Sequence, residues 1–447
     1  MIVTTFVSNP MVALTGNGAE ALTFVLMLAV FGVLAIAVRW PIGLALLVSA
    51  IFGAVTNGDY FPLRHLVEGA FSYLDPILVI ATAMILMRAL ADGQALDSLG
   101  WAVEDRFRTR PMLLLGLLMI IIMFPGMITG SSTASVLTTG AMAASIITRL
   151  GLSKERTGAI IAMGGVLGMI APPVNIPAMI IGGGVDLPYS GFGVQLALAS
   201  FPTALVIVYI LAWPVLRKPT KPALPSEENL PPTQISNRSS RVTLWRALTG
   251  PVVAGLLMLA PRLSPAHIPD PGLPLVFLLA AVAGILVLPK FDVRASMIRA
   301  MNESLPVLGI LCGVGAFIQV LTLTGSRGWL VSLMTGAPTW ALFAAAAVSV
   351  PLFGAVSAFG SSSVLGVPFL LALLGRNEII TAAALSVLAS LGDLMPPAAL
   401  AATLSAQVAG VDDRRKVLRL CIVPALLIVA VGLLMLIFAP QIGRLLP

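Results

Sequence analysis

The chain has 447 residues, of which 58% are hydrophobic and only 10% are charged, and its mean hydropathy is +1.02. A soluble domain has about a quarter charged residues, so this composition excludes a water-soluble globular protein. It predicts an all-α protein that crosses a membrane many times. The net charge of +7 is not interpreted as nucleic-acid binding, because basic residues in such proteins mark cytoplasmic loops.

The first half of the chain, residues 20–216, alternates apolar spans with shorter polar or mixed stretches. In chain order we expect spans at 22–38 and 41–57, a surface stretch at 60–73, a span at 75–91, a mixed-polarity helix at 94–108, a hairpin at 111–149, a broken span at 157–183 and a span at 193–216. The hairpin carries Gly130-Ser-Ser-Thr133, and the broken span carries the proline pair Pro172-Pro173. A proline pair breaks a helix by removing a donor and clashing one turn back.

A polar stretch rich in proline and serine, residues 217–246, predicts a cytoplasmic linker between the two halves. The second half, residues 247–447, repeats the plan of the first. Its expected segments are 249–260, 273–289, a surface stretch at 291–304, 305–322, 325–337, a hairpin at 339–375, a helix over 380–409 broken at Pro396-Pro397, and a span at 418–438.

Five short matches in the same order indicate an internal repeat. Three of them have an offset of 230 residues, including Gly130-Ser-Ser-Thr133 with Gly360-Ser-Ser-Ser363. Two later matches have offsets of 224 and 226, namely Gly168 to Pro173 with Gly392 to Pro397, and Gly184-Val-Asp186 with Gly410-Val-Asp412. The second hairpin tip is therefore predicted at Gly360 to Ser363.

The basic residues predict the orientation of the chain in the membrane. If each hairpin enters and leaves on one side, each half crosses five times, and the second copy is inverted. Twenty of the 26 lysines and arginines then fall on one side. The positive-inside rule makes that side cytoplasmic and places both termini in the periplasm.

The hairpin tips and the proline breaks have the chemistry of an ion site. Where one helix ends and another begins inside a membrane, free carbonyls and free N–H groups lie side by side. Ser131, Ser132 and Thr133 suit an N-terminal cap, and hydroxyl and carbonyl oxygens suit sodium. A single small-residue cluster would favour helix packing, but tip and break recur together in both halves. This is the general plan of inverted-repeat secondary transporters.

Three further polar residues lie in apolar surroundings. Asp393 is the only acid between Ile380 and Gly410, and it is a candidate cation ligand, proton carrier or structural hydrogen-bonding partner. Asn175, inside the first break, is a candidate substrate contact. Arg88 lies near the cytoplasmic end of its span, where we favour a snorkelling side chain over a substrate-binding one.

The run ITGSSTAS, the later GGVLGMIAPPVNIPAMI and the GGGVDLPYSGF turn resemble the large membrane subunit of tripartite ATP-independent periplasmic (TRAP) transporters. The resemblance extends over nearly the whole chain. It implies a bacterial inner-membrane, sodium-driven elevator that imports organic acids such as C4-dicarboxylates or sialic acid. It also implies two partners, a small four-span membrane subunit and a periplasmic substrate-binding protein, and no cofactor besides the coupling ions.

The resemblance also implies where sodium and substrate bind. The first sodium site would use Thr129 and Ser131, with Thr133 beside them, against Gly168, Ala171 and Pro172. The repeat then predicts a second site formed by Gly360, Ser361, Ser363, Gly392, Met395 and Pro396. Ser132 and Ser362 would join Asn175 as substrate contacts. The family often carries an aspartate at the second tip, where this chain has only hydroxyls, and Asp393 would supply that charge from the facing break.

Two other functional classes remain open at this point. One is a stand-alone symporter or exchanger of the same fold, coupled to sodium or to protons through Asp393. The other is a passive channel or membrane scaffold. An intramembrane enzyme is the least favoured class, because the spans contain no catalytic serine–histidine, paired-aspartate or metal-binding pattern.

Overall fold

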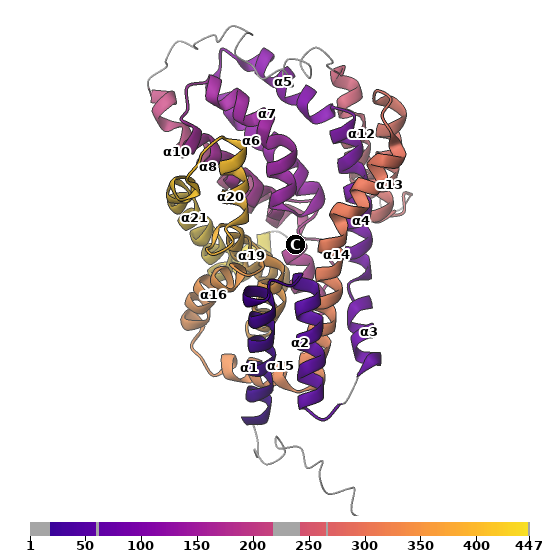
Figure 1. Cartoon of the computed structure of the whole chain (residues 1–447), viewed down its shortest axis with the longest axis vertical. Helices are drawn as coiled ribbons and strands as arrows, with labels where there is room; N and C mark the ends of the chain where they lie inside the picture. The colour runs from indigo at the N-terminus through magenta and orange to yellow at the C-terminus, as the bar shows by residue number, and fades with distance from the viewer. Residues whose placement is uncertain (1–17, 60–61, 218–241, 265–266, 446–447) are drawn as a thin grey trace, which may run out of the picture.

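The computed structural model describes the chain except for residues 1–17, 60–61, 218–241, 265–266 and 446–447. Its regular elements are helices throughout, so the prediction of a helical membrane protein is confirmed for these residues (Figure 1). Within the described ranges, seven helices are long and apolar enough to cross a membrane: Gly18–Ala37, Leu74–Asp92, Pro111–Thr129, Gly193–Pro214, Leu244–Leu263, Val293–Leu323 and Arg414–Ile437.

Helices of the first half follow the expected order. They are α1 (Gly18–Gly32), continued by a π-helical turn (Val33–Ala37), α2 (Ile42–Thr56), α3 (Leu63–Phe71), α4 (Leu74–Asp92), α5 (Ala95–Phe107), α6 (Pro111–Thr129), α7 (Ser132–Arg149), α8 (Lys154–Ile170), α9 (Ile176–Gly183) and α10 (Gly193–Arg217). Helices α6 and α7 form a hairpin, while α8 and α9 are two parts of one broken helix. Residues 218–241 of the predicted linker 217–246 lie outside the described residues, whereas residues 244–246 already belong to the next helix, α12 (Leu244–Leu263).

Helices of the second half begin after the linker. They are α12 (Leu244–Leu263), α13 (Leu273–Val287), α14 (Val293–Leu323), α15 (Ser326–Thr335), α16 (Thr339–Gly354), α17 (Ala358–Ser361), a π-helical turn (Ser362–Gly366), α18 (Val367–Ala372), α19 (Glu378–Ser390), a 3₁₀ turn (Leu391–Leu394), α20 (Leu400–Val408), α21 (Arg414–Ile437) and α22 (Ala439–Leu445). Helix α16 and the segment α17–α18 form the second hairpin, and α19 and α20 flank the second break.

One segment differs from its counterpart in the first half. The expected surface stretch 291–304 and the span after it are one continuous helix, α14, which contains Pro306. In the first half the chain breaks between α3 and α4 at Tyr73, whose ring is buried and whose hydroxyl donates to the Ile180 carbonyl at 2.9 Å. The second half continues through Pro306 as a helix, and in Figure 1 α14 runs beside α4 and then beside α3.

The second hairpin turns at a different place from the predicted one. The turn lies at Ala355 to Ser357, where Ser357 is extended (φ −165°) and its hydroxyl accepts a hydrogen bond from the Gly360 N–H. Ser357 caps α17, which starts at Ala358, two residues before Gly360. Gly360 to Ser363 therefore lie inside the helix that follows the turn and do not form the tip of the hairpin. The prediction of a tip at Gly360 to Ser363 is therefore wrong.

Packing divides the helices into two groups that each draw on both halves of the sequence. One buried cluster joins the hairpins to the broken helices and includes Leu118, Ile161 and Ala383. The other joins α1–α4 to α12–α14 and includes Ile80 and Phe317. Residues of the tips and breaks, among them Ile128, Val174 and Ile176, pack into this second cluster. The tips and breaks therefore lie at the boundary between the two groups.

Candidate functional site

The first hairpin turns sharply at Gly130 and Ser131. Gly130 adopts a left-handed conformation (φ +64°) that glycine tolerates without a Cβ clash, and its N–H donates to the Gly126 carbonyl at 2.7 Å. Ser131 then caps α7, accepting from the Ala134 N–H at 3.3 Å. Thr129 donates its hydroxyl proton to the Pro125 carbonyl at 2.7 Å, which leaves the oxygen lone pairs of Thr129 available to a cation.

The first break is organised by one buried side chain, Asn175. Its carboxamide oxygen accepts from the Ala178 N–H at 2.9 Å, which caps α9. Its amide group donates to the Ile170 carbonyl at the end of α8, at 3.1 Å, and to the Ser386 hydroxyl on α19, at 2.9 Å. Asn175 therefore satisfies both helix ends of the break and joins them to the second half. Both amide hydrogens of Asn175 are donated to protein groups. The contact of Asn175 with a substrate stays a prediction.

The first tip lies directly against the first break. The Val174 N–H in the break donates to the Met127 carbonyl near the end of α6, at 3.0 Å. A methyl group built on Gly168 would lie 2.5 Å from the Met123 carbonyl oxygen, and one on Gly126 would lie 2.9 Å from the Gly168 carbonyl carbon. Backbone of α6 therefore meets backbone of α8 here.

This close approach predicts that Gly168→Ala destabilises the protein. The added methyl cannot be accommodated by a side-chain rotation, because the atoms it meets belong to the Met123 backbone. Overpacking of this kind costs about 1–3 kcal/mol. Thermal unfolding in detergent should show a lower melting temperature for Gly168→Ala. The matched control is Gly255→Ala in α12, where a methyl meets nothing within 4 Å, and equal melting temperatures for both variants would contradict the interpretation.

The second cluster of hydroxyls lies within a helix rather than at its tip. Ser361 donates to the Val350 carbonyl at 2.5 Å, Ser362 to Ala358 at 2.9 Å and Ser363 to Gly360 at 3.1 Å. All three side chains are buried, and Ser362 begins the π-helical turn. Such wide turns are frequent at functional sites. Because each proton is donated to a carbonyl, the hydroxyl oxygens retain lone pairs suited to a cation.

The second break connects to both hairpins. Gly392 approaches the end of α16 so closely that a methyl on Gly354 would lie 2.7 Å from the Gly392 Cα. Asp393, in the 3₁₀ turn, accepts a hydrogen bond from the Ser132 hydroxyl at the start of α7. The carboxylate of Asp393 therefore accepts a hydrogen bond from the first tip. At the start of α20, Ala399 (φ +42°) supplies no side-chain cap.

A cavity of about 200 Å³ lies between the first tip and the helices α4 and α14. Three predicted cation ligands line it, namely Thr129, Ser131 and Thr133. Arg88 and Glu303 line it from the opposite side and form an ion pair, in which Arg88 Nε donates to Glu303 Oε2 at 2.7 Å. The snorkelling interpretation of Arg88 is therefore incomplete, because its guanidinium pairs with a second helix beside the first tip.

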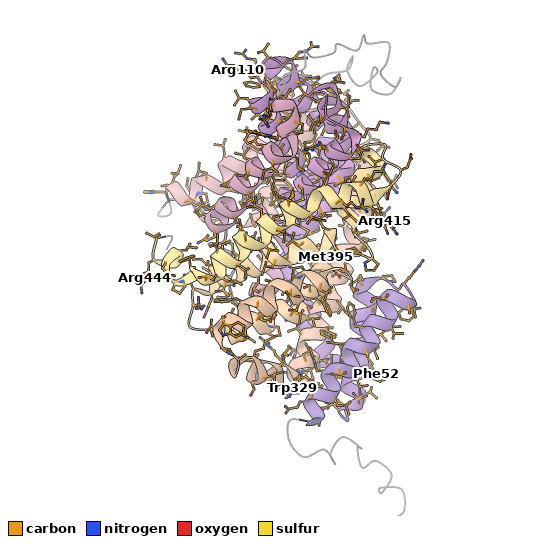
Figure 2. The ribbon with its side chains drawn as sticks, turned by 90° about the vertical axis from the view of Figure 1, so that its left-hand side faces the viewer. Phe52, Arg110, Trp329, Met395, Arg415 and Arg444 are labelled. Carbon is orange, nitrogen blue, oxygen red and sulfur yellow. The ribbon has the colours of Figure 1, made fainter. Side chains whose placement is uncertain are left out.

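Not all predicted site residues come together. Met395 and Pro396 line a different cavity of about 360 Å³ with Arg415 and Arg419. Figure 2 shows Met395 about midway along the long axis, between Arg110 at one end and Trp329 at the other. Sequence reasoning missed Glu303 and Ser386, since no local motif marks them. Their partners, Arg88 and Asn175, lie 215 and 211 residues away in the chain.

Comparisons with known proteins agree with this architecture. The family model described as "Tripartite ATP-independent periplasmic transporter, DctM component" matches residues 24–442. The YdaH transporter of Alcanivorax borkumensis is similar in structure, with a TM-score of 0.53, 16% identity, and coverage of 84% of this chain and 88% of that one. MtrF of Neisseria gonorrhoeae has a TM-score of 0.56 and 14% identity, over 85% of this chain and 84% of that one.

At such identities the two solved structures establish the fold alone, and no curated protein matches the chain. The family match, by contrast, extends from α1 into α22 and includes both hairpins and both breaks. DctM proteins are transporters rather than enzymes, and they normally work with a small membrane subunit and a substrate-binding protein. The chain belongs to the DctM family, and it is a multi-pass membrane protein that acts as the large permease component of a TRAP secondary transporter.

Proposed function

We propose that this protein imports small organic anions across the bacterial inner membrane and that a sodium gradient drives this import. The observation that carries the proposal is the first tip, where the Met123 carbonyl meets the break at Gly168 and where Thr129 and Ser131 line a cavity against α4 and α14. Oxygen atoms of hydroxyls and helix-end carbonyls gather there, and hard cations prefer oxygen ligands. The family supports the same role for the chain as a whole.

Two structural features support an elevator mechanism in which the two halves have inverted topology. The hairpins and broken helices share one buried cluster, while α1–α4 and α12–α14 share another. In the proposed mechanism the first group moves as one unit against the second group, which is the scaffold. The arm helices join the two groups. On α5, Glu104 accepts two bonds from Arg149 Nη2 of α7, at 2.8 and 2.9 Å, and on α15 Arg327 donates to the Gly184 carbonyl at 2.5 Å.

A second candidate function is a stand-alone symporter or exchanger coupled to protons. The contact between Asp393 and Ser132 favours it, because a carboxylate at the first tip can carry a proton as well as contact a cation. The two candidates differ in their partners and their coupling ion. Uptake that needs no binding protein and follows a proton gradient would replace the first proposal with the second.

Sodium binding can be tested without a substrate. We expect sodium chloride to raise the melting temperature of the purified protein relative to equal potassium or choline chloride, since a ligand of the native state stabilises it. Ser131→Ala should weaken this sodium response while leaving the protein folded in potassium, because Ser131 is only partly buried. A melting temperature that depends on ionic strength alone would contradict the proposed ion site.

A further inference from the structure

The ion pair between Arg88 and Glu303 has an unusual place for a pair that only joins helices. Arg88 comes from α4 and Glu303 from α14, and two parallel hydrogen bonds link them, the fork that guanidinium forms with any carboxylate. The side chains of Arg88 and Glu303 are 29% and 40% exposed, and both line the cavity beside the first tip.

Helices α4 and α14 are already joined by another ion pair of opposite polarity. Arg299 of α14 donates to Asp92 of α4 at 2.9 Å, and neither residue lines the cavity. Asp92 Oδ1 also lies 3.9 Å from Arg88 Nη1, so the four charges form one network. The two helices also pack along a shared face, with Ile80 and Val314 both buried. Within this network, Arg88 and Glu303 are the pair that lines the cavity.

We propose that Arg88 binds a carboxylate of the transported acid, and that Glu303 forms an ion pair with the guanidinium of Arg88 when the acid is absent. This inference rests on the proposed function. The exchange replaces one carboxylate by another of the same charge and geometry, so Arg88 never stays unpaired at a partly desolvated position. The acid would then lie between Arg88, on the α1–α4 and α12–α14 group, and the first tip on the hairpin.

The lining of the cavity indicates the chemistry of the acid. Apolar contacts come from Met84, Met87 and Val307, which suits a short methylene chain next to a charged end.

Ligand-induced thermal stabilisation in sodium tests the proposal on the full-length protein. The probes are succinate, glutarate and lactate, with uncharged succinamide as the matched control for succinate. We expect the acids, and not succinamide, to stabilise the wild type. Arg88→Gln should raise the half-maximal succinate concentration at least tenfold, and Arg88→Lys should raise it less. Glu303→Gln should lower it at least threefold, because the internal competitor is removed. Arg294→Gln, also on α14 but outside the lining of the cavity, should leave it within twofold.

A second measurement covers the case in which the Arg88 variants do not fold. Phenylglyoxal modifies accessible arginines, and peptide mapping should show that succinate, but not succinamide, protects Arg88 in the wild type while Arg299 is modified equally in both. If no acid stabilises the wild type, the proposed function fails and this inference with it. If acids stabilise the wild type but Arg88→Gln behaves like Arg294→Gln, or Arg88 is not protected, only the role of Arg88 is overturned.

Discussion

Asn175→Ala is expected to cause the largest loss of stability of any single substitution at the candidate site. The substitution removes three buried hydrogen bonds and leaves the Ile170 carbonyl and the Ala178 N–H without their partner. A buried polar group left unpaired costs about 1–3 kcal/mol, so the total reaches several kcal/mol. Thermal unfolding of the purified protein should show this as a large fall in melting temperature.

The control for this prediction is Asn377→Ala. Asn377 also caps a helix, accepting from the Ile380 N–H at 3.0 Å, but it is only partly buried and lies outside the breaks. Loss of an ordinary cap costs about 1 kcal/mol. Equal losses of stability in the two variants would show that Asn175 is a simple cap and does not hold the break together.

Asp393→Asn is expected to have the largest effect on ion coupling. Asparagine has nearly the same shape and can still accept a hydrogen bond from Ser132, but it lacks the negative charge. If the carboxylate helps to hold a cation beside the first tip, the sodium concentration for half-maximal stabilisation or uptake should rise at least tenfold, which corresponds to about 1.4 kcal/mol of binding free energy.

Ser132→Ala separates the charge of Asp393 from its hydrogen bond. This variant removes the hydroxyl donor and keeps the carboxylate, so we expect a change of less than threefold in sodium dependence. If Asp393→Asn leaves the sodium dependence unchanged, and if Asp393→Asn and Ser132→Ala lower the melting temperature equally, the contact between Ser132 and Asp393 is structural. A lost pH dependence of uptake in Asp393→Asn, with sodium dependence intact, would favour the proton-coupled alternative.

Local chemistry explains why the first tip could be predicted from sequence. Gly130 and Ser131 combine a residue that tolerates positive φ with an N-terminal capping residue, and the proline pair at Pro172 marks the break that faces them. Each of these signals acts over a few residues. Hydropathy in turn predicted the order of the helices, because an apolar run of sufficient length has few alternatives in a membrane.

The second hairpin shows where such signals fail. Aligning Gly360 with Gly130, at an offset of 230, pairs residues of similar type. The structural counterpart of Ser131, however, is Ser357, at an offset of 226, because both serines cap the helix that follows the hairpin turn. The same offset relates Pro125 to Pro351, the prolines inside α6 and α16. The later repeat matches, at offsets of 224 and 226, already contained this information. A single serine that caps a helix is a weaker sequence signal than three serines in a row.

Contacts between distant segments could not be predicted at all. The hydrogen bond from Ser132 to Asp393 joins residues 261 positions apart, and the pairing of Arg88 with Glu303 joins α4 to α14. Such pairs depend on how the two groups of helices pack, and one sequence carries no local trace of that packing. The assignment of Asp393 to the second site therefore rested on its position in the chain, whereas the structure places it against the first tip.

Sodium-driven uptake into liposomes tests the central claim most directly. The chain would be reconstituted with the small membrane subunit and binding protein that its family uses, together with the acid that stabilises it most. An inward sodium gradient should drive accumulation of that acid above its external concentration, and an equal potassium gradient should not. Accumulation that is the same with either cation, or mere equilibration in both, would contradict sodium-coupled transport by this protein.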